Sequence, residues 1–160
     1  MVRLEPVTKK NIWQLLKLRV HEDQRDFVAS NTESIVKAYL ALSSGGHAWP
    51  FGIYDDDTPV GFLMIGYGVD EEWVDPPAYA RDGYTLWRLM IDRQYQGRGY
   101  GRTAIALALD FIRTFPCGKA ETCYLSYEPD NARARFLYHS VGFAETGDMD
   151  GDEAVAVLYL

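Results

Sequence analysis

The feature that most constrains the fold is a run of three glycines within five residues, at Gly97, Gly99 and Gly101. The run follows an apolar, strand-like segment at residues 84–91 and precedes residues 103–115, whose apolar side chains recur at helical spacing. Glycine lets a ligand approach the backbone closely, and the first turn of a helix presents unpaired N–H groups and the positive end of its dipole. The pattern therefore predicts a strand, an anion-binding loop and a helix, with a phosphate or pyrophosphate as the ligand.

The spacing of the glycines narrows the type of phosphate site. Gly-x-Gly-x-Gly lacks the last interval of the dinucleotide-binding pattern, and no Lys-Ser or Lys-Thr pair completes a nucleotide-binding P-loop. The segment instead reads Gln96-x-x-Gly99-x-Gly101, which resembles the acetyl-CoA-binding loop of the GNAT superfamily of N-acetyltransferases. The alternative is a glycine-rich surface turn that only caps a helix.

Length and composition fit a single domain over residues 1–160, which the resemblance implies is an N-acetyltransferase domain. With 48% hydrophobic residues the chain can bury a substantial core and is not expected to be disordered. A net charge of −7 disfavours nucleic acid and membrane partners and favours cationic small molecules or basic peptides. Cys117 and Cys123 have no neighbours at ligand spacing, so neither a metal site nor a disulfide framework is expected. With no signal-like N-terminus and no membrane-spanning apolar run, a cytoplasmic location is expected.

Hydrophobic periodicity predicts a mixed α/β fold. Strands are expected at residues 2–7, 47–54, 59–68, 84–91, 122–127, 143–145 and 154–160, and helices at residues 8–19, 32–40, 103–115 and 131–141. Residues 70–82 are expected to form an irregular loop. Because only the strand-helix-strand unit around the glycines calls for parallel strands, the central sheet is predicted to be mostly antiparallel, with helices flanking it.

A second segment, Asn131 to Phe143, is similar to another GNAT signature, Asn-x-x-Ala-x-x-Leu-Tyr-x-x-x-Gly-Phe. Arg135 stands where the family usually has alanine. The resemblance implies that Asn131 contacts the pantetheine part of coenzyme A and that Tyr138 is the general acid toward the departing thiolate. A tyrosine packed into the core is the alternative for Tyr138. The resemblance extends over essentially the whole chain and implies a single-domain GNAT fold.

The resemblance also assigns the acetyl-CoA site. Backbone N–H groups near the end of the strand are expected to hold the acetyl carbonyl and stabilise its oxyanion, while arginines at positions 93, 98 and 102 supply positive charge for the pyrophosphate. The expected cofactor-binding residues are Leu89, Met90, Ile91, Gln96, Gly97, Arg98, Gly99, Tyr100, Gly101, Arg102 and Asn131.

The N-terminal half resembles, within the superfamily, bacterial spermine/spermidine acetyltransferases. The matching residues are Gln24-x-x-Phe27-Val28-Ala29-x-Asn31-x-x-Ser34 and Trp87-Arg88-Leu89-Met90-Ile91-Asp92. The implied reaction is direct attack of a primary amine of a small polycation, spermidine or spermine, on acetyl-CoA in a ternary complex. The expected substrate-binding residues are Glu22, Asp23, Trp87 and Glu128.

The sequence is compatible with several choices of general base, acceptor and assembly. The general base is one of several carboxylates, namely Glu22, Asp23, Glu33, Glu71, Glu72 or Glu128. The acceptor is alternatively an aminoglycoside, an amino acid or a protein N-terminus, or the chain is a non-catalytic sensor of coenzyme A. Members of the family often dimerise, and the C-terminal strands are where a homodimer interface is expected.

Overall fold

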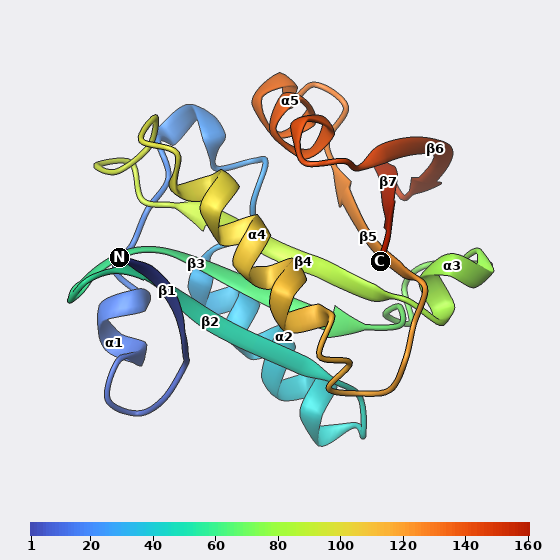
Figure 1. Cartoon of the computed structure of the whole chain (residues 1–160), viewed down its shortest axis with the longest axis horizontal. Helices are drawn as coiled ribbons and strands as arrows, with labels where there is room; N and C mark the ends of the chain where they lie inside the picture. The colour runs from blue at the N-terminus through green and yellow to red at the C-terminus, as the bar shows by residue number, and fades with distance from the viewer.

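A seven-stranded mixed sheet organises the computed structural model, which describes residues 1–160 (Figure 1). The strand order is β1-β2-β3-β4-β5-β7-β6. The strands are β1 (Val2–Pro6), β2 (Ala48–Asp55), β3 (Thr58–Tyr67), β4 (Tyr84–Ile91), β5 (Thr122–Tyr127), β6 (Ala144–Asp150) and β7 (Glu153–Tyr159). The helices are α1 (Ile12–Leu15), a 3-10 turn η1 (Glu22–Gln24), α2 (Asn31–Ser43), α3 (Ala78–Arg81), α4 (Tyr100–Ile112) and α5 (Ala132–Ser140).

Helices α4 and α2 cover opposite faces of the sheet, as Figure 1 shows with α4 in front of the strands and α2 behind. On β3, Leu63 belongs to the core cluster under α4, whereas Phe62 and Met64 belong to the cluster with Ala38 of α2. This alternation follows from the two-residue period of a strand, which sends successive side chains to opposite faces. The central strands are therefore buried on both sides.

The strand pairing around the glycine loop is unusually short. Strands β4 and β5 are parallel, as expected, but only Tyr84 with Cys123 and Thr85 with Tyr124 are paired. Beyond Thr85 the backbone groups that β4 directs toward β5 have no strand partner, so they are free to bond a ligand. Trp87 has no partner on β3 either, because the β3–β4 register shifts there and leaves a bulge. In Figure 1, β5, β7 and β6 lean away from β4.

Several predicted boundaries are wrong, and non-local contacts explain the largest error. The helix expected at residues 8–19 covers only Ile12–Leu15. The backbone N–H of Arg19 bonds the Asp92 carboxylate at 2.9 Å, and the Leu15 carbonyl accepts a bond from the Asn31 side chain at 2.8 Å. Both contacts take backbone groups away from a continuing helix.

Smaller differences concern the ends of other elements. Helix α4 begins at Tyr100, three residues earlier than expected and directly after Gly99, whose backbone is left-handed. It ends at Ile112, and Phe115 lies beyond it with a φ of 53°. Residues 78–81 of the expected loop form the short helix α3, and β6 runs to Asp150. None of the helices combines the length and the apolar character needed to cross a lipid bilayer.

Candidate active site

A cavity of about 690 Å³ opens where β4 and β5 part. Its walls are the segment of residues 20–29, β4, the glycine loop, the first turn of α4, the end of β5 and helix α5. The structure brings together eleven residues expected to bind cofactor or act in catalysis: Leu89, Met90, Ile91, Gln96, Gly97, Gly99, Tyr100, Gly101, Arg102, Asn131 and Tyr138. Trp87, expected at the acceptor, also lines the cavity. We call this space the thioester cavity.

The glycine loop leaves its backbone open toward solvent. Gly97 and Gly99 have φ values of 77° and 84°, which side-chain-bearing residues adopt only at a cost, and a Cβ on either would meet nothing within 4 Å. Gly101 differs, since its Cβ would lie 3.2 Å from the Leu137 side chain and so serves the packing of α4 against α5. Helix α4 has no side-chain cap, so the N–H groups of its first turn face the loop without partners. This is the geometry of an anion site.

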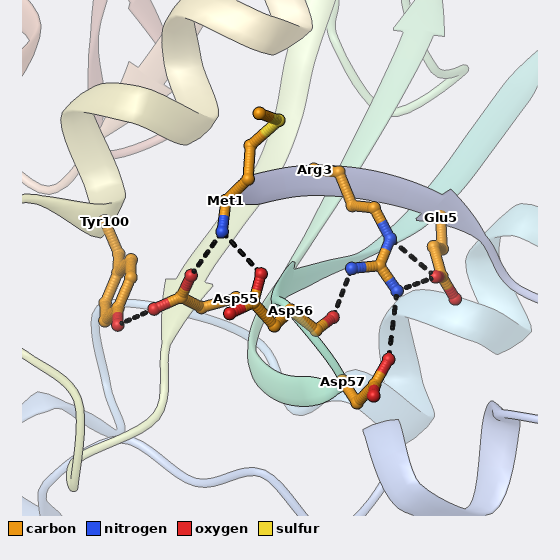
Figure 2. A network of polar contacts seen from close by, with 7 residues as sticks. All are labelled: Met1, Arg3, Glu5, Asp55, Asp56, Asp57 and Tyr100. Carbon is orange, nitrogen blue, oxygen red and sulfur yellow. Dashed lines mark hydrogen bonds and ion pairs between the residues drawn. The ribbon is translucent and has the colours of Figure 1, made fainter.

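Tyr100, at the start of α4, is held by Asp55, which does not line the cavity; Figure 2 shows this contact. Its hydroxyl donates a hydrogen bond of 2.6 Å to Asp55, whose other carboxylate oxygen accepts from the ammonium group of Met1 at 3.2 Å. The hydrogen bond from Tyr100 is the largest cause of the lowered pKa of Asp55, and Asp55 in turn raises the pKa of Tyr100. The pair ties the beginning of α4 to the end of β2.

The charges around the thioester cavity are mostly positive. Four arginines line it, at positions 25, 88, 102 and 133, against two carboxylates, Asp26 and Glu153. This excess suits a pyrophosphate. Of the three arginines expected to provide that charge only Arg102 is in place; Arg98 stacks on the Tyr95 ring at 5.6 Å instead, and Arg93 is exposed outside the cavity.

Tyr138 lines the thioester cavity from α5. Its ring packs 5.7 Å from that of Tyr127 and 6.1 Å from that of Phe143. Burial raises the pKa of Tyr138 well above its ordinary value, and the negative charge of Glu153 adds to the rise. The phenol therefore keeps its proton and is available as a donor. Asn131 starts the helix, and its side-chain oxygen accepts the N–H of Ala134 at 3.2 Å.

A second cavity, of about 910 Å³, adjoins the first on the other side of the splayed strands. It lies between the segment after β3 and the β6–β7 turn, and we call it the acidic cavity. Seven carboxylates line it, those of Asp70, Glu71, Glu72, Glu128, Asp150, Asp152 and Glu153, against the cations Lys37 and Arg88. Five residues line both cavities: Leu86, Trp87, Arg88, Ser126 and Glu153. The two spaces thus meet at one place.

Two of the expected substrate-binding residues, Glu22 and Asp23, lie outside both cavities. They sit exposed on η1, where Glu22 faces Arg25 at 3.6 Å. The thioester cavity is lined instead by the residues that follow, from Gln24 to Ala29. Glu128, another of the expected substrate-binding residues, lines the acidic cavity.

Three polar residues at the junction were not singled out from the sequence as site residues. Arg88 lies on β4, its Nε is buried without a hydrogen-bond partner, and burial lowers its pKa. Ser126 on β5 donates a hydrogen bond of 2.5 Å to Glu153 on β7. The available signal for Arg88 was a charged residue inside an otherwise apolar strand; Ser126 and Glu153 carry no local motif.

Comparison with known proteins agrees with this geometry. The model of the acetyltransferase (GNAT) family matches residues 12–143. The spermine/spermidine N(1)-acetyltransferase of Bacillus subtilis (strain 168) is 29% identical over 153 residues, which cover 93% of this chain and 91% of that protein.

Two solved structures share the fold. The aminoglycoside acetyltransferase AAC(6')-Ib in complex with coenzyme A superposes with a TM-score of 0.79 at 15% identity, covering 99% of this chain and 95% of that one. The PaiA N-acetyltransferase of Thermoplasma acidophilum, also in complex with coenzyme A, gives 0.69 at 15% identity, covering 100% and 99%. At these identities the likeness concerns the fold.

Proposed function

The chain belongs to the acetyltransferase (GNAT) family, and from this premise we propose that it transfers an acetyl group from acetyl-CoA to a primary amine of a small polycation, spermidine or spermine. The observation that carries the choice of acceptor is the acidic cavity, which meets the thioester cavity at five shared residues. The Bacillus subtilis relative bears the name of a spermine/spermidine acetyltransferase, which supports the same acceptor class.

Acetyl-CoA is assigned to the thioester cavity. The N–H groups of residues 97–101 and the first turn of α4 would hold the pyrophosphate, with Arg102 and Arg133 adding positive charge. The pantetheine arm would run along the edge of β4 that has no partner beyond Thr85, where the N–H groups of residues 89–91 are candidates to bond the acetyl carbonyl. The thioester then lies next to Tyr138.

The acceptor amine is assigned to the acidic cavity. A polyamine carries several positive charges along a flexible chain, and the carboxylates around this cavity offer a partner for each charge. Only the reacting nitrogen must pass the junction to reach the thioester. There Arg88 places a like charge near the ammonium, which lowers the pKa of the ammonium and favours the free amine.

Tyr138 is the donor toward sulfur in this scheme. The free amine attacks the carbonyl carbon, the C–S bond breaks with its electron pair on sulfur, and the Tyr138 hydroxyl donates to that sulfur. Because the pKa of Tyr138 is raised, the hydroxyl is protonated throughout the physiological range. Its ring is fixed between Tyr127 and Phe143, which supplies the orientation that such a donor needs.

The test is a panel of acceptors assayed with acetyl-CoA by release of free thiol. Spermidine and spermine are expected to give the highest kcat/KM, and butylamine, which has one charge, a much lower one. Kanamycin tests the aminoglycoside alternative, since an aminoglycoside is also a polycation, and a peptide with a free N-terminus and an amino acid test the others. Preference for one of these reassigns the acceptor, whereas binding of acetyl-CoA without turnover of any amine indicates a sensor.

A matched pair of variants tests the acidic cavity itself. Glu128→Gln removes one charge from its wall, so we expect the KM for spermidine to rise about threefold, the effect of one partly exposed ion pair. The control is Asp57→Asn, which removes an exposed charge at the β2–β3 turn, away from both cavities. Equal KM values in the two variants would contradict the proposed acceptor site.

A further inference from the structure

Glu153 is the only carboxylate among the five residues that line both cavities. The other acidic side chains of the acidic cavity, such as Glu128 and Asp150, line that cavity alone. Asp26, the other carboxylate of the thioester cavity, lines only that one. A group that removes a proton from the acceptor nitrogen must reach that nitrogen where it meets the thioester. Glu153 is the carboxylate in that place.

The position of Glu153 is fixed by the strand next to it. Ser126 Oγ donates a hydrogen bond of 2.5 Å to Glu153 Oε2. The last pair between strands β5 and β7 is Tyr127 with Ala154, and Glu153 is the residue of β7 immediately before Ala154. No protein group hydrogen-bonds the second carboxylate oxygen, Oε1. One oxygen is therefore held by the protein while the other is available to a ligand.

The groups that face Glu153 come from three other elements. Among the carboxylates, Glu153 acts most strongly on the charge of Arg88 of β4, and its charge also acts on Tyr138 of α5 and on Asp150 of β6. The sulfur donor Tyr138 and the Glu153 carboxylate therefore line the same thioester cavity, and of the two only Glu153 also lines the acidic cavity. An amine between them would meet a proton acceptor first and a thioester beyond it.

We propose that Glu153 is the general base of the acetyl transfer, and that Ser126 positions it; this inference rests on the function proposed above. The Glu153 carboxylate takes one proton from the acceptor ammonium and leaves a free amine. The nitrogen lone pair forms the C–N bond, the C–S bond breaks, and the sulfur takes its proton from Tyr138. The second proton leaving the nitrogen replaces the proton of Tyr138, and Glu153 returns its own proton to solvent, so one proton is released per acetyl group.

The experiment measures kcat against pH for the wild-type protein and for Glu153→Gln, with acetyl-CoA binding measured by calorimetry. We expect kcat at neutral pH to fall about a hundredfold or more in the variant, as loss of a general base usually causes, while the Kd for acetyl-CoA stays within about twofold of wild type. The residual rate should rise about tenfold per pH unit up to the pKa of the amine, because only amine that is already deprotonated can react. Unchanged binding of acetyl-CoA shows that the variant is folded.

Two further variants separate a base from a merely charged neighbour. Asp150→Asn removes a carboxylate from the other side of the same hairpin and should raise the KM for the amine without producing the new pH slope. Ser126→Ala should lower kcat about tenfold, the effect of one lost hydrogen bond to a charged group, and Ser126→Thr, which keeps the hydroxyl, should restore part of it.

The outcomes distinguish the two proposals. If the wild-type protein acetylates amines other than polyamines and Glu153→Gln shows the new pH slope, the base is supported and only the acceptor changes. A Glu153→Gln variant with the pH profile of wild type would overturn the role of Glu153 and leave the acetyltransferase assignment standing. Absence of turnover with every amine, despite binding of acetyl-CoA, would overturn both.

Discussion

The side-chain amides of Gln24 and Gln96, far apart in the sequence, exchange hydrogen bonds of 2.8 and 3.2 Å, and both residues line the thioester cavity. Gln96 also donates to the carbonyl of Ile91 at 3.0 Å. Gln96 therefore holds the glycine loop against both η1 and the end of β4. Its side chain is engaged with protein, so its contribution to ligand binding passes through the shape of the loop.

Loss of this link should weaken acetyl-CoA binding. Replacing either glutamine by alanine removes the same pair of hydrogen bonds, so each of Gln24→Ala and Gln96→Ala is expected to raise the Kd by about three- to tenfold. The double variant should be little worse than Gln96→Ala, because the mutual pair is already lost and the second change removes only the hydrogen bond from the His21 N–H to Gln24. The control is Gln94→Ala, because Gln94 lies in the same connection and its side chain makes no hydrogen bond. Calorimetric titration decides, and fully additive effects would contradict the coupling.

The open space around Gly99 gives a second prediction. Gly99 and Gly147 have nearly equal φ values, 84° and 87°, and a Cβ on either would meet no protein atom within 4 Å. Gly99→Ala and Gly147→Ala should therefore lose similar stability, about 1 kcal/mol, from the left-handed backbone. Only Gly99→Ala places a methyl group in the anion site, so it alone should weaken acetyl-CoA binding, by at least about tenfold. Equal affinity in the two variants would place the pyrophosphate elsewhere.

Tyr138 is tested by separating turnover from binding. Tyr138→Phe keeps the ring between Tyr127 and Phe143 and removes only the hydroxyl. We expect kcat to fall by about ten- to a hundredfold with the Kd for acetyl-CoA unchanged, since the donor acts on the departing sulfur. Tyr159→Phe, at an exposed tyrosine, is the control. Wild-type kcat in Tyr138→Phe would mean that another group protonates the sulfur.

The parts of the fold that the sequence predicted are those set by local chemistry. The strand at residues 84–91 and the strand at residues 122–127 match β4 and β5 because each is an apolar run bounded by turn-forming residues. The glycine loop could also be predicted, because the positive φ values that it needs are accessible to glycine wherever it stands in a sequence. The first helix was too long because Asp92, distant in the sequence, binds the N–H of Arg19.

The two cavities differ in the same respect, since one could be predicted from local sequence and the other could not. The thioester cavity follows from two motifs, one in the glycine loop before α4 and one on α5, and its predicted residues other than Arg98 lie together. The acidic cavity is assembled from residues 70–72, residues 126–128 and residues 150–153, which approach one another only through the order of the strands. No local pattern connects Ser126 with Glu153. The sequence therefore left the base among several surface carboxylates and did not include Glu153.

The alkaline stability of the protein should depend on Tyr127. Burial raises the pKa of Tyr127 to about 12, and its hydrogen bond to the Glu145 carboxylate adds to the rise. A phenol with a raised pKa in the folded state stabilises the fold fully below the pKa of the unfolded chain, about 10, and this contribution is lost as the pH rises through the folded value. The free energy of unfolding should therefore fall between about pH 10 and about pH 12.

Tyr127→Phe isolates this contribution. The variant has no phenol to ionise at that position, so its unfolding free energy should fall less steeply with pH than that of the wild type, by on the order of 1 kcal/mol across the window. It should already be less stable near neutral pH, because Glu145 loses the Tyr127 donor and keeps only its ion pair with Arg135 at 2.7 Å. Urea unfolding at about pH 9 and about pH 11.5 measures both effects. Tyr159→Phe, at the exposed end of β7, should keep the wild-type slope, and the same slope in Tyr127→Phe would show that the buried phenol does not govern the alkaline loss.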